Sequence, residues 1–194
     1  MSDEHELWLV RHGETEWSKT GQHTSRTDVP LTEPGERQAE ALGGLLGGRT
    51  FARVLSSPKR RALDTCRLAG YGDVVETADD LREWDYGEYE GEKTVDIRKT
   101  RPDWTLWTDG APGGEAPAQI GERARRVLAE LEPAGGDVVL FSHGHFLRVL
   151  TATWLGLPPE SGRLFGLSTA TLSRLGHERE HRVVWLWNRP TDIG

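Results

Sequence analysis

Three short apolar segments, each followed by arginine or histidine, constrain the fold more than any other feature of the chain. Residues 7–10 run into Arg11-His12-Gly13, residues 137–142 into His143-Gly144-His145, and residues 53–57 into Pro58-Lys59-Arg60-Arg61. Short apolar runs of this kind are typical of buried strands. Ligands of open α/β sheets bind just beyond the carboxyl ends of the strands, so parallel pairing would gather these imidazole and guanidinium groups in one crevice.

Segments with helical spacing separate the predicted strands. We expect helices over residues 33–46, 58–69, 92–101, 118–131 and 145–155, with Thr32 as a cap and Pro133 among the residues that end the fourth helix. Further strands are expected at 74–75, 170–175 and 182–187, the last two as an antiparallel edge, and irregular connections at 16–30 and 104–117. This alternation predicts a three-layer α/β/α sandwich with a mostly parallel central sheet, in a single domain over residues 1–194.

The composition indicates which partners the protein can bind and in which cellular compartment it is expected. Because the net charge is −7 over 194 residues, attraction to nucleic acid or to an anionic membrane is not expected, and a phosphate site must be a local positive cluster. No apolar run approaches a membrane-spanning length, and residues 2–6 lack a signal-peptide pattern. The single cysteine, Cys66, suits the cytoplasm and is expected to be a small buried helix residue. The sequence does not fix the oligomeric state, and a homodimer is left open.

The side chains at the predicted crevice suit phosphoryl transfer. That reaction needs an in-line nucleophile, positive groups around the phosphoryl oxygens and an acid for the leaving oxygen. A neutral imidazole such as His12 can be the nucleophile when its other nitrogen is held by a hydrogen-bond acceptor. Arg11 and Arg61 can clamp phosphate oxygens in a bidentate manner, and His143 can donate a further hydrogen bond.

The proton donor to the leaving alcohol is left between Glu83 and Asp85, since a carboxyl beside a phosphate dianion holds its proton more tightly. One rival function is a metal hydrolase that uses His12, His143, His145 and Asp85, although the two arginines would repel a cation. A second rival is a non-catalytic module that binds phosphorylated ligands, and turnover of an aryl phosphate would exclude it. A nucleic-acid-binding protein is not indicated, because the chain lacks a basic stripe with interleaved aromatic residues.

Residues 9–17, which contain Arg11-His12-Gly13-Glu14, resemble the opening signature of the histidine phosphatase superfamily, which includes the cofactor-dependent phosphoglycerate mutases. Four further segments resemble that family's motifs in the same order: 28–32 with Gly35 and Gln38-Ala39, 56–58 with Arg61-Ala62 and Thr65, 81–83 with Tyr86-Gly87 and Glu90-Gly91, and 142–144. The resemblance spans residues 7–150 and implies a phosphoglycerate mutase-like fold.

The resemblance also implies roles for individual residues. It makes His12 the phosphorylated nucleophile and Glu83 the proton donor, and it assigns the phosphate pocket to Arg11, Arg61 and His143. Substrate binding is assigned in addition to Ser18, Thr24 and Gly144. The family works without a metal or another cofactor. The chain departs from the family pattern at Ser18, Gln22 and Ser25, which leaves the identity of the small phosphorylated metabolite open.

Neighbouring residues compete for two of these roles. The spacing to Thr65 favours Arg61 over Arg60, and Asp85 is expected to bond nearby backbone. Glu115 resembles a family residue near the mouth of the site, with a supporting or a purely structural role.

The segment that would cover the site is short, since the mutases carry a longer basic and proline-rich stretch where this chain has only residues 92–117. Water would then reach a phosphohistidine, so we expect a phosphatase that hydrolyses small phosphomonoesters, with mutase-type phosphoryl transfer as the alternative. Four aromatic residues are expected to line an apolar mouth, with ordinary packing as the alternative: Trp84, Tyr86, Trp104 and Trp107. His23 is expected to be a solvent or loop residue close to the site, and Arg26 offers a second anion contact. The sequence leaves the roles of Arg26, His145 and segment 104–107 open.

Overall fold

The computed structural model describes residues 5–132 and 134–191, which build a six-stranded sheet in the order β3-β2-β4-β1-β5-β6. The strands β1 (Leu7–Arg11), β2 (Arg53–Ser56), β3 (Val75–Thr77) and β4 (Val138–Ser142) pair in parallel. The strands β5 (Thr171–Glu178) and β6 (His181–Pro190) add the antiparallel edge. The mostly parallel sheet predicted from the sequence is therefore confirmed.

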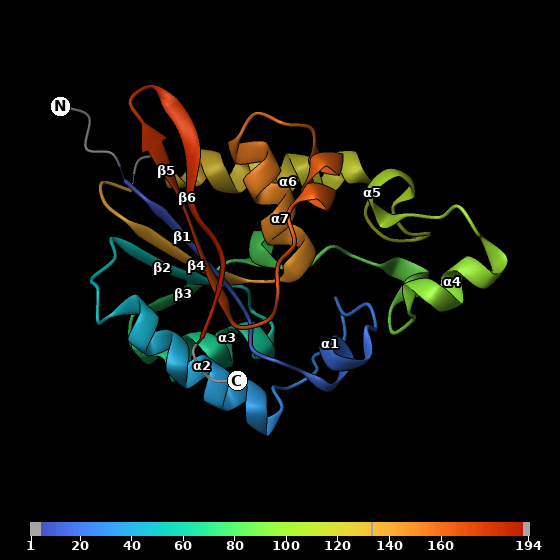
Figure 1. Cartoon of the computed structure of the whole chain (residues 1–194), viewed down its shortest axis with the longest axis horizontal. Coiled ribbons are helices and arrows are strands. Elements are labelled where there is room, and N and C mark those ends of the chain that lie inside the picture. The colour runs from blue at the N-terminus through green and yellow to red at the C-terminus, as the bar shows by residue number, and fades with distance from the viewer. Residues whose placement is uncertain (1–4, 133, 192–194) are drawn as a thin grey trace.

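Helices cover both faces of the sheet and make three layers (Figure 1). Helices α2 (Glu33–Leu46) and α3 (Arg60–Cys66) pack on one face, and α6 (Pro117–Leu131) and α7 (Gly144–Trp154) pack on the other. The helix α2 begins where expected, because the Thr32 side chain accepts a hydrogen bond from Gly35 N at 3.1 Å.

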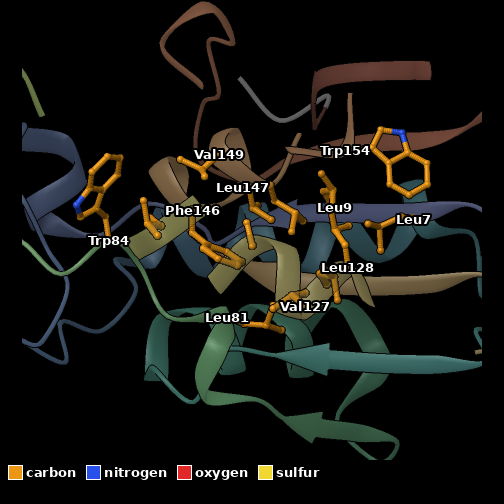
Figure 2. Close-up of a cluster of buried hydrophobic side chains, with 14 of the residues drawn as sticks. Leu7, Leu9, Leu81, Trp84, Val127, Leu128, Phe146, Leu147, Val149 and Trp154 are labelled. Carbon is orange, nitrogen blue, oxygen red and sulfur yellow. The ribbon is translucent and has the colours of Figure 1, made fainter. Parts of the chain in front are cut away.

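Alternate residues of β1 supply the two cores, as the two-residue period of a strand requires. Leu7 and Leu9 face α6 and α7 in the cluster that Figure 2 shows, whereas Trp8 and Val10 face α2 and α3. Cys66 lies in the second cluster, fully buried as predicted, and burial raises the pKa of its thiol to about 12.

The structure corrects several element boundaries. The predicted loop 16–30 contains the short helix α1 (Glu16–Thr20), and the predicted irregular segment contains α5 (Leu106–Asp109). The helix expected over 58–69 is α3 followed by a π-helical turn at Arg67–Tyr71, and α4 spans Thr94–Thr100. Short 3-10 turns lie at Asp79–Leu81, Gly87–Tyr89 and Pro159–Leu164.

Two expectations from the sequence concern residues outside the described ranges: the helix end at Pro133 and most of the N-terminal segment 2–6. Among the described residues, no helix is both long enough and apolar enough to span a bilayer.

The carboxyl ends of β1, β2 and β4 lie next to one another at one edge of the sheet. Arg11 pairs with Ser142, and Ser56 pairs with Phe141. Helices α1, α4 and α5 lie on the same side of the molecule, at the right of Figure 1. The residues that follow the three strands are thus brought together, as the apolar segments predict.

Candidate active site

His12 is the first residue after β1, and backbone bonds fix it at the sheet edge. Its N–H donates to the Ser142 carbonyl at 3.1 Å, and its carbonyl accepts from Ala170 N at 2.9 Å. The imidazole is buried, and its Nδ1 lies 2.7 Å from the Gly13 carbonyl oxygen. Because a carbonyl oxygen can only accept, Nδ1 must carry the proton, which leaves Nε2 with a lone pair. His12 therefore has the tautomer that a nucleophile needs.

Two glycines allow the loop after His12 to touch the start of α2. A Cβ on Gly13 would lie 2.4 Å from the Gly35 carbonyl oxygen, so a side chain has no room there. The Gly13 N–H donates to Thr65 Oγ1 at 3.0 Å, and that hydroxyl donates to the Arg61 carbonyl at 2.7 Å. Thr65 thus links the loop of the predicted nucleophile to the helix that carries Arg61.

Arg11 and Arg61 enter the site from different elements. Arg11 ends β1 and donates from Nη1 to the Leu167 carbonyl. Arg61 lies in the first turn of α3, fully buried, and donates from Nη1 to the Thr27 carbonyl at 3.2 Å and from Nη2 to the Thr24 carbonyl at 3.1 Å. Both guanidinium groups are held by backbone carbonyls, with no carboxylate bound directly to either in the described chain.

His143 completes the cluster. Its ring centroid lies 5.2 Å from that of His12, and its Nε2 lies 2.8 Å from Ser57 Oγ. Within the described residues, five buried side-chain nitrogen atoms lack a hydrogen-bond partner, and three of them are Arg11 Nε, Arg61 Nε and His143 Nδ1. Buried polar atoms are normally satisfied, so their concentration here points to a ligand with several acceptor oxygens.

Burial and positive charge keep both histidines neutral. The pKa of His12 is held well below its ordinary value, first by burial and then by the charges of Arg61 and Arg11. The pKa of His143 is lowered in the same way, first by burial and then by the charge of Arg61. A bound dianion would offset the repulsion from the arginines.

Glu83 lies at the amino end of α7, with its carboxylate almost fully buried. Its Oε1 accepts from Trp84 N at 2.9 Å and from Phe146 N at 2.8 Å, and its Oε2 accepts from His145 N at 3.0 Å. An oxygen of a carboxylate has two acceptor positions. Oε1 is therefore saturated, whereas Oε2 keeps one lone pair.

The competing residues have structural partners. Asp85 accepts from Gly87 N at 2.9 Å and pairs with Arg26 at 2.8 Å, so it binds nearby backbone as expected. Glu115 pairs with the buried Arg123 at 2.7 Å. The Arg60 guanidinium is largely exposed and pairs with Asp64.

Three of the predicted substrate-binding residues, Ser18, Thr24 and Gly144, border a cavity of about 260 Å³ whose lining also includes Arg11, His12 and Glu83. Arg61 and His143 are fully buried and are not part of that lining. The hydroxyl of Ser18 accepts from Thr15 N at 2.9 Å in the capping box of α1 and donates to the Thr15 carbonyl at 2.9 Å, so its proton is not directed at the cavity. Thr24 lends its carbonyl to Arg61. Gly144 leaves room for Arg11, because a Cβ there would lie 3.1 Å from the guanidinium carbon.

The prediction that four aromatic residues line an apolar mouth of the site is wrong for most of them. Trp84 and Trp104 are buried in the core, and neither lines the cavity, whereas Tyr86 does. His23 is buried rather than solvent-exposed, with its ring centroid 4.6 Å from that of Tyr86. The Tyr86 hydroxyl lies 2.6 Å from His145 Nδ1, which gives His145 a partner in the cavity wall.

Sequence reasoning missed two residues of the site. Ser57 follows β2 and binds His143, and its position directly after a predicted strand was the available signal. Arg148 lines the cavity with its guanidinium 4.4 Å above the Trp107 ring. It lies four residues after Gly144, one turn along a helix already predicted, so helical spacing would have placed it beside the site.

The rival metal site does not form. Within residues 5–132 and 134–191, no three or more His, Cys, Asp or Glu side chains are arranged to hold a metal ion. Asp85 is bound to Arg26, and His145 is bound to Tyr86.

Comparisons with known proteins agree with this geometry. Residues 7–190 match the histidine phosphatase superfamily (branch 1). The chain is 45% identical over 196 residues to an acid phosphatase of Mycobacterium tuberculosis, an alignment that covers 97% of this chain and 96% of that protein. It is 38% identical over 183 residues to the sedoheptulose 1,7-bisphosphatase of Saccharomyces cerevisiae, covering 77% of this chain and 67% of the relative.

A solved structure of a Mycobacterium tuberculosis open reading frame superposes with a TM-score of 0.91 at 43% identity, covering 96% of this chain and 98% of the other. The match to the superfamily extends over nearly the whole described chain, in agreement with the five ordered motifs of the sequence. The chain therefore belongs to the histidine phosphatase superfamily and has its phosphoglycerate mutase-like fold.

Proposed function

We propose that this phosphoric monoester hydrolase cleaves small phosphomonoesters through a phosphohistidine intermediate on His12. One observation carries the assignment of the residues. The lone pair of His12 Nε2 lies in the same buried cluster as three unpartnered nitrogen atoms, which belong to Arg11, Arg61 and His143. These groups suit a phosphoryl group, whose oxygens accept hydrogen bonds while the phosphorus accepts the imidazole.

In the first step, His12 Nε2 attacks phosphorus and the bond from phosphorus to the ester oxygen breaks. Arg11 and Arg61 stabilise the charge on the phosphoryl oxygens, and Glu83 gives a proton to the leaving oxygen. The atom suited to this transfer is Glu83 Oε2, since it keeps a lone pair on which a proton can sit.

In the second step, water attacks phosphorus and the bond to His12 breaks, which releases inorganic phosphate. The carboxylate of Glu83, left without its proton, accepts one from the attacking water. The Nδ1–H of His12 stays bound to the Gly13 carbonyl throughout, so the ring keeps its orientation.

Hydrolysis is favoured over mutase-type transfer by the cover of the site. From segment 92–117, only Thr94 lines the cavity. The segment's two arginines bind elsewhere: Arg98 donates to the Trp104 carbonyl at 2.9 Å, and Arg101 donates to the Tyr89 hydroxyl at 3.0 Å. A cover without inward cations does not hold a second phosphorylated species over the site.

Arg148 supports a leaving group that carries an anionic group of its own. Its guanidinium is half-buried in the cavity wall. Burial is the largest influence on its pKa and lowers it, Glu83 raises the pKa, and Arg11 lowers it, so the net effect is a lowered pKa. The relative described as a sedoheptulose 1,7-bisphosphatase takes a sugar bisphosphate by its name, and this chemistry agrees with a cation on the leaving-group side. We therefore propose a phosphorylated sugar or acid as the substrate.

The experiment that tests the intermediate is rapid quenching with a ³²P-labelled phosphomonoester. Wild-type protein is expected to retain acid-labile, alkali-stable label, as a phosphohistidine does, and His12→Asn is expected to lose both label and turnover. Label that persists in His12→Asn, or turnover without label on His12, would overturn the assignment. Release of phosphate, rather than an isomerised phosphoester, from phosphoglycerates separates the phosphatase from the mutase.

The remaining parts of the proposal concern the whole chain. We propose a single domain over residues 1–194 and a cytoplasmic location, for which the lone Cys66 is the supporting observation. A homodimer stays a prediction that sedimentation can test.

A further inference from the structure

Arg123 is a buried arginine on α6 that lies outside the substrate cavity. A guanidinium has five N–H donors, and each of those of Arg123 has an acceptor. Nε donates to Glu115 Oε1 at 2.9 Å, and Nη1 donates to the carbonyls of Asp80 at 2.8 Å and Arg82 at 2.6 Å. Nη2 donates to the Glu83 carbonyl at 3.2 Å and to Glu115 Oε2 at 2.7 Å.

Through these acceptors, Arg123 holds the residues just before and just after Glu83, the proposed proton donor. Arg123 holds the carbonyls of residues 80, 82 and 83 directly. It holds the residues that follow through Glu115, whose Oε2 accepts from Asp85 N at 2.9 Å and whose carbonyl accepts from Trp84 Nε1 at 2.9 Å. The backbone on both sides of Glu83 is thus fixed to one guanidinium and its counter-ion.

The same guanidinium contacts the helix that orients the Glu83 carboxylate. Its carbon lies 4.6 Å from the centroid of the Phe146 ring, a cation–π contact, and Phe146 N donates to Glu83 Oε1 at 2.8 Å. Phe146 and Trp84 belong to one buried cluster, which Figure 2 shows. Arg123 therefore links the loop that carries Glu83 to the amides that bind its side chain.

We propose that Arg123, with Glu115 as its counter-ion, is a positioning residue that holds Glu83 Oε2 at the leaving oxygen. The inference rests on the proposed function, in which Glu83 protonates that oxygen. Errors of about 1 Å in the placement of a reacting group can cost on the order of 100-fold in rate. Loss of Arg123 should therefore slow the first step, phosphoryl transfer to His12, for esters whose leaving oxygen needs the proton and spare that step for esters whose leaving oxygen does not.

The test compares an alkyl phosphate, whose alkoxide must be protonated, with p-nitrophenyl phosphate, whose phenolate leaves unprotonated. The quantity compared is kcat/KM, which ends at release of the leaving group and so excludes the later water step in which Glu83 is the base. Arg123→Ala is expected to lower kcat/KM for glycerol phosphate by about 10–100-fold and kcat/KM for the aryl phosphate by less than about 3-fold, a partial loss of the roughly 10²–10⁴-fold that general acid catalysis contributes. Arg123→Lys keeps a charge but has three donors, so it should restore only part of the ratio. Arg126→Ala is the matched control, because Arg126 lies on the same helix, is exposed and donates to the Asp80 carboxylate rather than to the backbone beside Glu83.

A double-mutant cycle with Glu83→Ala separates positioning from general stability. In that background Arg123→Ala is expected to have no further effect on either substrate. Equal losses for both substrates in Arg123→Ala, or full additivity in the cycle, would overturn the inference. If Glu83→Ala alone lowers kcat/KM equally for both substrates, the acid role in the proposed function fails instead. Should Arg123→Ala not fold, the same ratio measured in Glu115→Gln decides, and an unchanged ratio refutes the proposal.

Discussion

Replacing Arg61 tests the phosphate pocket most directly, because this fully buried side chain has two of its bonds on backbone carbonyls and its Nε unpartnered. Arg61→Ala removes a charged donor from the transition state, which typically costs about 10²–10³ in rate, or roughly 3–4 kcal/mol. It also leaves the carbonyls of Thr24 and Thr27 without donors, so we expect the free energy of unfolding to fall by about 1–3 kcal/mol.

The assays are kcat/KM for p-nitrophenyl phosphate and the thermal midpoint with and without inorganic phosphate. At a phosphate concentration of 100 times Kd, ligand linkage stabilises the wild-type protein by about 2.7 kcal/mol, which is roughly 5–10 °C for a chain of this size. Arg61→Ala should lose most of that shift. Arg61→Lys keeps the charge, but one ammonium cannot hold both carbonyls and a phosphate oxygen. Its kcat/KM should therefore lie between that of the wild-type protein and that of Arg61→Ala.

Arg60 is the matched control, since it precedes Arg61 on α3 and its guanidinium is largely exposed. Arg60→Ala should stay within about 2-fold of wild type in kcat/KM, as surface substitutions away from a site usually do. The reasoning is refuted if Arg61→Ala retains the phosphate-induced shift, or if the two alanine variants lose activity equally.

Three further predictions follow from burial and close contact. Because burial and the arginines lower the pKa of His12, its neutral form persists at acid pH, and the acid limb of kcat/KM, corrected for substrate ionisation, should lie below pH 6.5; a limb at 6.5 would contradict this. A Cβ on Gly35 would lie 2.2 Å from a backbone oxygen of the loop after His12, so Gly35→Ala should lower the free energy of unfolding, measured in urea, by at least about 1–3 kcal/mol. A Cβ on Gly44 would have no atom within 4 Å, so Gly44→Ala should not lower it. Burial lowers the pKa of His23 from 6.5 to about 4. As the pH falls, His23 is therefore protonated in the unfolded chain before it is protonated in the folded one, and the free energy of unfolding should fall by about 3 kcal/mol between pH 6.5 and pH 4. His23→Gln should reduce that fall while exposed His181→Gln should not, and identical acid unfolding of the two variants would exclude the assignment.

The parts of the site that follow strands could be predicted from the sequence. Apolar runs locate strands, and a parallel sheet places the residues after them at one edge, which is how His12 and His143 come together. The cap at Thr32 and the flanking glycine likewise fixed the bounds of α2. These signals are local, so one sequence is enough to read them.

The rest depends on contacts that leave no local signal. The carbonyls that hold Arg61 and Arg123 belong to backbone, which any residue type supplies, so no spacing could identify them. The aromatic prediction failed because apolar side chains near a site are also what a core uses, and Trp84 is in the core. The helix α1 was missed because its polar residues lack an apolar face, although the cap at Thr15 was readable.

The hydroxyl of Thr65 joins Gly13 N and the Arg61 carbonyl, and so connects two segments that are distant in sequence. The proposed nucleophile and the guanidinium proposed to bind phosphate are therefore coupled through one hydroxyl, and we expect the distance between them to change little when either segment moves. Loops that contact the alcohol portion of a substrate can then differ in sequence or move without changing the distance on which bond formation to phosphorus depends.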